Sequence, residues 1–344
     1  MMPRGKVLFG VLVVSLSITV MSQSTLAVQK GEGAKQKLEK AMDLYSTARF
    51  DNAIEILSEL AKDRSLDKKD QREVLLALGR AYVAKGLKNK ALSAISRMLD
   101  LEPPMIEPDP DTECPPLMKV YYNARKQKSG SNVAERGDPG IKTIAILDFM
   151  NRSVDDKEKF DPLEKGFAEL LINHLNGATN LKVIERERIQ WILDEIGLEN
   201  DPGKFDMGSA VRVGKQLGVH TVLLGSFIKV KGDLKLLARL VKVETSEILA
   251  TEEATGDADD FFELAEKLSV KVAKDINVKL AQSEAAAKTD TKSLDAMLSY
   301  SEGLVSIEKG NYKEAYDKFM QALTYDPTYD RARQKAETIK PLIG

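Results

Sequence analysis

The sequence contains few of the residue types that build catalytic or metal centres. Its 344 residues include one cysteine, two histidines and one tryptophan. The single cysteine, Cys114, excludes an intrachain disulfide, and its Pro-rich surroundings predict an incidental thiol. Neither His174 nor His220 has a Cys, Asp or Glu at a metal-ligand interval, so both are predicted to be hydrogen-bonded structural residues. We therefore expect no catalytic residue, no cofactor-binding residue and no metal ligand.

The sequence also lacks an excess of charge of one sign. The 51 Lys and Arg residues nearly balance 53 Asp and Glu residues. A broad electrostatic surface for nucleic acid needs clustered positive charge, so nucleic acid is not an expected partner. Gly214-Lys215 and Gly203-Lys204 do not have the spacing of a phosphate-binding loop, which argues against nucleotide binding.

The sequence begins with the features of a secretion signal. Arg4 and Lys6 precede an apolar run of about 15 residues, which is shorter than the roughly 20 that span a bilayer. Thr25-Leu26-Ala27 then offers the small residues that signal peptidases recognise. Residues 1–27 are predicted to be a cleaved signal peptide, which places the mature chain in the periplasm. The alternative is an uncleaved membrane anchor; a lipid anchor lacks the cysteine it needs after the apolar run.

Residues 33–127 have the periodicity of paired amphipathic helices. The clearest part follows the 34-residue tetratricopeptide (TPR) pattern, with small residues Gly79 and Ala91 where two helices cross and Pro103 after the second helix. The segment Leu117–Lys126 is predicted to be a short helix that caps these repeats. Residues 128–140 are poor in apolar side chains and are predicted to be a linker.

A tetratricopeptide array presents a groove formed by its first helices. In the second predicted repeat, Glu73, Leu76, Arg80 and Val83 would face that groove and bind an envelope protein. The alternative is that the repeats only extend the domain and pack on one another or on another copy of the chain.

The C-terminal part predicts one more helical repeat, over residues 293–340, after a second linker at residues 282–292. Gly303, Gly310 and Phe319 stand at tetratricopeptide intervals. A single repeat cannot bury its own apolar face. It must pack on the central domain, on the N-terminal repeats or on another protomer, and the sequence leaves these alternatives open.

The central residues 141–281 alternate between strand and helix patterns. Predicted strands cover residues 142–149, 181–185, 221–231, 234–243 and 247–255. Predicted helices follow an apolar face between Leu163 and Leu175 and then cover residues 186–196, 207–217 and 259–280. Gly232-Asp233 is the expected hairpin turn. The fold class is therefore α+β, with helices on a mixed sheet and α-helical repeats on both sides of it in the chain.

These residues resemble a known family. The segments Val183-Ile184-Glu185-Arg186 and Gly214–Phe227, in this order after the strand that ends at Phe149, are similar to the CsgG-like envelope family, which includes the curli secretion channel. The resemblance covers about residues 141–280. It implies a fold and a place in building or exporting envelope material, and it implies no catalytic motif.

Two features depart from the curli channel. The channel is a lipoprotein, and here no cysteine follows the signal segment. The channel also inserts long strands that form a membrane barrel, which need about 9–11 residues of sustained alternation each. The connection Gly197–Asp206 is too short and polar for such a hairpin. Five cations interrupt the hairpin Thr221–Val243: Lys229, Lys231, Lys235, Arg239 and Lys242.

Several charged or aromatic residues have both a structural and a functional interpretation. Asp148 follows an apolar strand, where a functional carboxylate is common, although a turn or cap role is favoured here. The run Glu185–Arg188 predicts a helix-start ion-pair cluster worth little energy, or else a docking surface. Trp191 is predicted to be partly buried. Asp257 is predicted to cap the last helix of the domain, with Asp259 and Asp260 in its first turn, rather than to bind calcium.

Together these features predict a non-enzymatic scaffold or adaptor of the periplasm, which binds envelope proteins through its repeats. It would lie in the periplasm or at the periphery of the outer membrane, and self-association is a further expectation. The main alternative is a subunit of a CsgG-like outer-membrane secretion channel. An envelope enzyme is the third interpretation, and it would need a titratable constellation that the sequence does not show.

Overall fold

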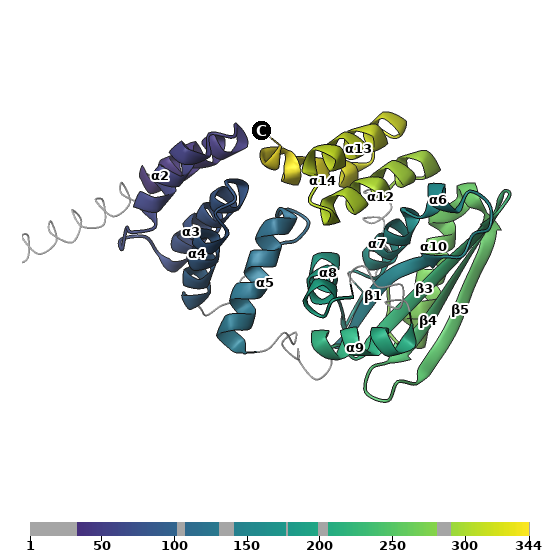
Figure 1. The fold of residues 1–344 in the computed structure, drawn as a ribbon. Coiled ribbons are helices and arrows are strands. Elements are labelled where there is room, and N and C mark those ends of the chain that lie inside the picture. The colour runs from purple at the N-terminus through teal and green to yellow at the C-terminus, as the bar shows by residue number, and fades with distance from the viewer. Residues whose placement is uncertain are drawn as a thin grey trace, which may run out of the picture. The chain divides into compact units, whose positions relative to one another are not determined.

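The computed structural model describes residues 33–101, 107–130, 141–176, 178–198, 206–280 and 290–343. It divides into two compact units, one up to Pro104 and one from Met105 onward (Figure 1). The predicted signal peptide, Pro103 and the Gly203-Lys204 pair lie outside the described residues, as does most of each predicted linker.

The first unit is helical. A helix over residues 33–46 precedes α2 (Phe50–Leu60), α3 (Lys68–Ala84) and α4 (Lys88–Asp100). Asp67 caps α3, because its side chain accepts the backbone N–H of Asp70 at 2.8 Å. Small residues Ala53, Ala81 and Ala91 are fully buried between the helices. The assignment of these helices to the tetratricopeptide class stays a prediction.

The second unit contains a mixed five-stranded sheet with the order β2-β1-β3-β4-β5. Its strands are β1 (Lys142–Asn151), β2 (Leu181–Val183), β3 (Thr221–Val230), β4 (Asp233–Lys242) and β5 (Ile248–Asp257). Strand β1 runs parallel to β2 and β3, and β3, β4 and β5 form an antiparallel meander. This arrangement confirms the predicted α+β fold class, with helices before and after the sheet in the chain.

Two helices cover one face of the sheet (Figure 1). They are α7 (Leu163–Leu175) and α10 (Phe261–Asp275), and every residue of α7 except Glu164 is buried. Three aromatic rings fill the space between α7 and the strands: the Phe167 ring lies 5.0 Å from the Phe227 ring and 6.2 Å from the Phe149 ring. Alternation along the strands supplies this apolar face, as the sequence pattern predicts.

The opposite face of the sheet is covered by α9 (Met207–Leu217) near β1 and β3. Val222 points away from the α7 side because its neighbour Leu223 points toward it. A Cβ at Gly214 of α9 would lie 2.6 Å from a methyl group of Val222, so α9 packs closely on this face. Gly218 ends α9 in the left-handed conformation, with φ of 70°.

The C-terminal helices pack on the α/β domain, which answers the question that the sequence left open. They are α12 (Leu294–Glu308), α13 (Tyr312–Tyr325) and α14 (Asp330–Ile339), and α12 lies along α7. Gly303 of α12 meets the Phe319 ring of α13 where the two helices cross, as the spacing predicts. The Tyr300 ring is fully buried between Phe319 and Tyr329.

The helix α5 (Pro115–Ser129) forms where the sequence predicts a short helix, and its role as a cap on the N-terminal repeats stays a prediction. It lies against α8 (Arg186–Glu195) within the second unit. Trp191 of α8 donates its indole N–H to the Asn123 side chain at 3.0 Å, and its ring packs on that of Tyr122. Trp191 is 4% exposed, so it is more deeply buried than expected.

The hairpin turn differs from the prediction by one residue. Val230 pairs with Asp233, so the two turn residues are Lys231 and Gly232 rather than Gly232 and Asp233. Lys231 has a φ of 56°, which a two-residue turn of this twist requires. The last helix of the domain starts at Phe261, after a 3-10 turn over Ala258–Asp260.

Candidate functional site

The predicted partner-binding residues follow one face of α3. Glu73 is exposed, Leu76 and Arg80 are half-buried, and Val83 is buried with 9% of its surface exposed. The spacing of three, four and three residues puts these side chains on one stripe of the helix. The first three thus combine an acid, an apolar residue and a base that a partner can reach, whereas Val83 contributes mainly to packing.

Asp148 is neither a turn residue nor a cap, which corrects the favoured sequence interpretation. It lies near the end of β1, is 9% exposed, and forms two ion pairs. Lys165 Nζ of α7 lies 2.8 Å from Asp148 Oδ2, and Arg186 Nη1 of α8 lies 2.6 Å from Asp148 Oδ1. Glu308, at the end of α12, pairs with the same two cations at 2.5 Å each.

This four-residue cluster, which we call the Asp148 cluster, balances two negative and two positive charges. Burial raises the pKa of the Asp148 carboxyl, but Arg186 and Lys165 outweigh burial and hold that pKa well below its usual range. Asp148 and Glu308 raise the pKa of Arg186 despite its burial. Asp148 and Arg186 therefore stay ionised and paired, and the cluster joins β1, α7, α8 and α12 rather than supplying a free acid or base.

The run Glu185–Arg188 is also more than an exposed ion-pair cluster of low energy. Arg186 belongs to the Asp148 cluster, and Glu187 accepts a hydrogen bond from Lys335 of α14 at 2.9 Å. Lys335 is 5% exposed, and its pKa is raised mainly by Glu187 and Glu169, against the effect of burial. In the structure these residues contact the chain's own C-terminal helices, and a docking surface for another protein stays a prediction.

A second buried cluster lies between α7 and α14. Arg331 Nε is 2.9 Å from Asp290 Oδ1, and Arg331 Nη1 is 3.6 Å from Glu169 Oε1. The other oxygen of Asp290, Oδ2, is buried without a hydrogen bond in the described structure. Burial raises the pKa of Asp290 to about 6, despite Arg331. Arg331 therefore pairs with two buried carboxylates, Asp290 and Glu169. Of these, Asp290 binds a proton at a higher pH than an ordinary aspartate does.

Both histidines have structural roles, as predicted. His220 Nδ1 lies 2.8 Å from the Thr143 hydroxyl and also accepts the Thr143 backbone N–H at 3.2 Å. His174 is buried edge-on to the Phe262 ring, and its Nδ1 is 3.4 Å from the Ser269 hydroxyl. Burial lowers the pKa of His174 to about 4, so its imidazole is neutral near pH 7.

The remaining chemical candidates keep structural roles. Cys114 is buried at the start of α5. The Asp257 side chain accepts the backbone N–H of Asp259 at 2.9 Å, so it caps the 3-10 turn that holds Asp259 and Asp260. Within the described ranges, no group of three or more His, Cys, Asp or Glu side chains is arranged to hold a metal ion. No helix within those ranges is both long and apolar enough to span a bilayer.

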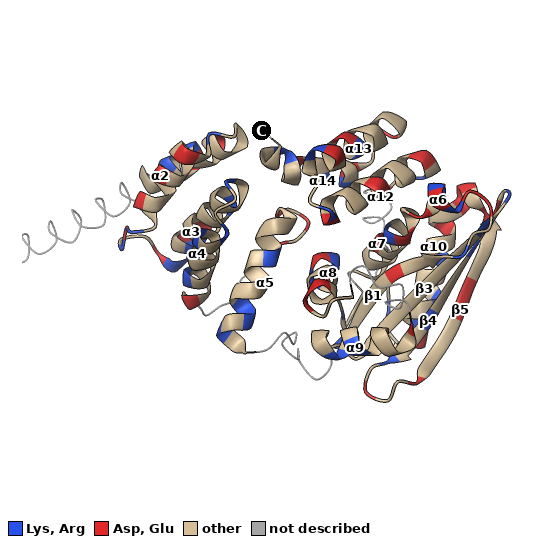
Figure 2. Ribbon diagram, in the orientation of Figure 1, with Lys and Arg blue, Asp and Glu red and all other residues tan. Residues whose placement is uncertain are grey.

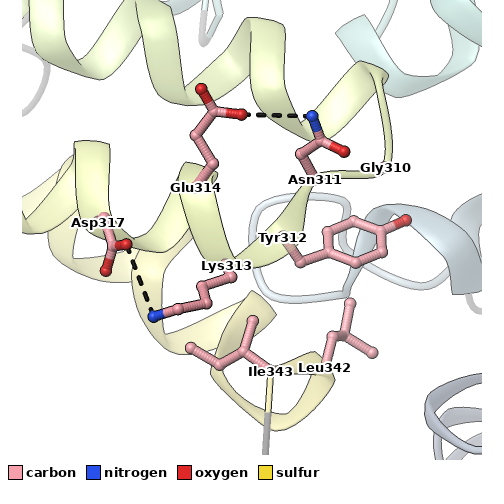
Figure 3. Close-up of a pocket in the computed structure, with 8 residues that line it drawn as sticks. All are labelled: Gly310, Asn311, Tyr312, Lys313, Glu314, Asp317, Leu342 and Ile343. Carbon is pink, nitrogen blue, oxygen red and sulfur yellow. Dashed lines mark hydrogen bonds and ion pairs between the residues drawn. The ribbon is translucent and has the colours of Figure 1, made fainter.

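A pocket of about 570 Å³ opens at the start of α13 (Figure 3). Its polar side is formed by two contacts, Asn311 to Glu314 at 3.3 Å and Lys313 to Asp317 at 3.7 Å. Its apolar side is formed by Tyr312, Leu342 and Ile343. The charged side chains that line the pocket are exposed and take part in these two contacts. The pocket therefore lacks the buried polar group that would fix a ligand.

The sequence pattern could not identify Glu308, Asp290 or Lys335 as cluster members. Each reaches a partner more than 110 residues away in the chain: Arg186, Asn173 and Glu187, respectively. The available signal was weaker: Asp148 ends an apolar run in the sequence, and Arg186 and Glu187 start a predicted helix.

Comparison with known proteins finds a similarity that includes most of the central strands. Residues 127–231 match the family model described as "Curli production assembly/transport component CsgG". A search of curated proteins finds no significant match. The matched region contains β1, β2, β3, α7, α8 and α9. It therefore includes Asp148 on β1 and Arg186 on α8.

Solved structures with a similar fold include two domains and a lipoprotein. The C-terminal domain of LpoB from Escherichia coli is 16% identical, with 40% of this chain and 94% of that chain covered and a TM-score of 0.29. The same domain from Salmonella enterica is 16% identical, with coverages of 41% and 95% and a TM-score of 0.27. Lipoprotein GNA1162 from Neisseria meningitidis is 16% identical, with coverages of 39% and 94% and a TM-score of 0.27. At these TM-scores, no conclusion about function follows from them.

Proposed function

We propose that this chain is a non-enzymatic scaffold of the periplasm that takes part in the assembly or export of envelope material. The observation that carries the proposal is the match of residues 127–231 to a family described as a curli assembly and transport component. The predicted signal peptide supports the compartment. In the α/β domain, the buried charges of the Asp148 cluster pair with opposite charges and hold helices on the sheet. Such an arrangement suits a rigid scaffold.

In this proposal, α3 recruits the partner protein. Glu73, Leu76 and Arg80 form a stripe of mixed chemistry on α3, and they suit a partner helix with a complementary apolar and charged face. Helix α12 cannot bind a partner helix in the same way, because its surface packs on α7.

The experiment places a photo-crosslinking amino acid at position 76 in the cells that make the protein. Asn89, exposed on α4, is the control position. We expect one discrete adduct from position 76, no adduct from position 89, and at least a fivefold weaker adduct when Glu73→Lys is added. An adduct that forms equally from both positions, or no adduct from position 76, would contradict recruitment through α3.

A second candidate function is a subunit of a secretion channel, because the family description includes transport. Light scattering of residues 28–344 with and without lipid vesicles separates the two. A monomer or small oligomer that ignores vesicles supports the scaffold. A closed ring of eight or more copies that sediments with vesicles would overturn it in favour of the channel.

A further inference from the structure

Strand β5 forms one edge of the sheet. Its ten residues, Ile248–Asp257, pair with β4 on one side. Within the described ranges, no strand pairs with its other side, and Figure 1 shows β5 running along the outside of the sheet. Helix α10 covers one face of β5 and leaves its backbone edge open. The strand is as long as its neighbours, so it offers a full-length template for another strand.

The register identifies which residues turn their backbone toward the open edge. Ala258 donates its backbone N–H to the Gly232 carbonyl at 2.7 Å, which makes these two a hydrogen-bonded pair. Hydrogen-bonded pairs recur at every second residue of an antiparallel ladder. From Ala250 to Gly256, the even-numbered residues of β5 therefore bond to β4, and Thr251, Glu253 and Thr255 point their N–H and C=O groups outward.

A side-chain contact agrees with this register. Lys271 of α10 donates a hydrogen bond from Nζ to the backbone carbonyl of Glu253 at 2.8 Å. A lysine reaches this carbonyl because the carbonyl faces away from β4. Lys271 also lies 3.4 Å from the Glu252 carboxylate. A basic side chain on this edge therefore already meets both a backbone acceptor and an acidic group.

Strand β5 lacks two of the devices that commonly block sheet edges, proline and a lysine of its own. It contains no proline, lysine or arginine, and Thr251 and Thr255 are exposed β-branched residues that favour strand pairing. At its start, Ile248 and Leu249 are each 49% exposed. The register shift between β4 and β5 lies beside these two residues and leaves the remainder of the strand regular.

The segment around this edge is rich in acidic residues, and two of them already pair with lysines: Glu253 lies 2.6 Å from Lys235 and Glu252 lies 3.4 Å from Lys271. Residues 244–260 contain seven acidic side chains and no basic one: Glu244, Glu247, Glu252, Glu253, Asp257, Asp259 and Asp260. Figure 2 shows acidic positions and no basic position along β5. A second copy of the same strand would bring like charges together, which disfavours self-pairing.

We propose that β5 binds an extended, lysine- or arginine-rich segment of a partner protein, which adds to the sheet as a sixth strand. Main-chain hydrogen bonds to Thr251, Glu253 and Thr255 would supply the affinity, and the acidic side chains would select a basic partner. The incoming backbone N–H would take the place of Lys271 on the Glu253 carbonyl, and the incoming cations would compete with Lys235 and Lys271 for the Glu253 and Glu252 carboxylates. This surface shares no residue with the α3 stripe, so the inference goes beyond the proposed function and stands or falls separately.

The test uses residues 28–344 and a fluorescent peptide with the sequence Thr-Lys-Val-Lys-Thr-Lys-Val-Lys-Thr. Control peptides carry Glu in place of Lys, or Pro in place of the central Thr. Fluorescence anisotropy should detect binding of the lysine peptide that is at least tenfold tighter than that of either control. Equal binding of all three peptides would overturn the proposal.

Two variants separate backbone pairing from general attraction. Thr255→Pro removes one outward N–H, which an edge strand tolerates, and should weaken peptide binding at least tenfold. Thr255→Val keeps that N–H and should change binding less than twofold. Hydrogen exchange on the unmodified chain supplies a readout independent of the variants: the amides of Thr251 and Thr255 should exchange at least tenfold more slowly with the peptide bound. Unchanged exchange there, or equal binding by the two variants, would contradict strand addition.

Discussion

Gly166 of α7 lies so close to Ser301 of α12 that a Cβ at position 166 would overlap the Ser301 hydroxyl. The terminal methyl of Met297 would lie 2.7 Å from the same Cβ. The absence of a side chain at Gly166 therefore lets α12 approach α7. This close approach is the apolar part of the interface that attaches the C-terminal helices to the α/β domain.

The first prediction concerns this approach. Gly166→Ala should lower the free energy of unfolding by about 1–3 kcal/mol, because α12 must shift to admit the new methyl group. Urea denaturation followed by circular dichroism measures the change. Gly208→Ala is the matched control in the first turn of α9, where the nearest atom to the new Cβ is a side-chain oxygen of Asp206 at 3.3 Å. The control should be neutral or slightly stabilising, since alanine favours helix more than glycine does.

The second prediction concerns the Asp148 cluster. Asp148→Asn leaves Lys165 and Arg186 with one carboxylate, Glu308, between them. Breaking a buried ion pair costs about 3–5 kcal/mol, so we expect a loss of this size in the free energy of unfolding. Asp317→Asn is the control, because it removes an exposed pair with Lys313 and should change stability by less than about 1 kcal/mol. Similar losses in the two variants would contradict the assigned role of the cluster.

The third prediction concerns the pH dependence that Asp290 produces. Its pKa is about 6 in the folded chain against an ordinary value of 3.8, so the folded state binds the proton more readily. Its contribution to stability is full below pH 3.8 and is lost as the pH rises through 6. Asp290→Asn does not titrate, and should gain up to about 3 kcal/mol relative to the unmodified chain between pH 4 and pH 7. A difference that does not change with pH would contradict this assignment.

His174 should produce the opposite slope. Its pKa falls from 6.5 to about 4 on burial, so the unfolded chain binds the proton more readily between these values. Stability from His174 is present above pH 6.5 and is lost as the pH falls toward 4. His174→Gln should therefore gain stability relative to the unmodified chain as the pH decreases. Urea denaturation of both variants at pH 4, 5, 6 and 7 compares the two slopes directly.

The fourth prediction concerns the attachment of α5 to α8. Asn123→Ala removes the acceptor of the Trp191 indole N–H and leaves that donor buried, which costs about 1–3 kcal/mol. Trp191 is the only tryptophan, so its fluorescence reports on this contact alone. We expect a shift of the emission maximum to longer wavelength in Asn123→Ala. Asn89→Ala, on exposed α4 surface, should leave the emission unchanged.

Elements with a strong local pattern were predictable from the sequence. Helix α9 has the predicted bounds, Met207–Leu217, because an apolar stripe, the Asp206 cap and Gly218 all lie within one short segment. The β3–β4 hairpin was also predictable, but its turn lies one residue earlier than expected, because Lys231 takes the positive φ that the pattern assigned to the Gly232-Asp233 pair.

The ion-pair clusters were not predictable, because their partners are distant in the chain. Asp148 looked like a turn residue because the sequence shows no acid or base that pairs with it, whereas the fold brings Lys165 and Arg186 to its two oxygens. The contact of α5 with α8 was not predictable either, because Tyr122 and Trp191, whose rings pack together, are far apart in the chain. Helical periodicity shows which side is apolar and does not show what covers it.

The separation of Glu308 from its partners affects the order in which the chain can complete its fold. During synthesis, Asp148, Lys165 and Arg186 emerge well before Glu308, so for that interval two cations share one carboxylate. The α/β domain can reach its full stability only after α12 has been made. If the chain is exported, the late arrival of Glu308 would keep the domain loosely folded during passage and delay its final closure until almost the whole chain is across.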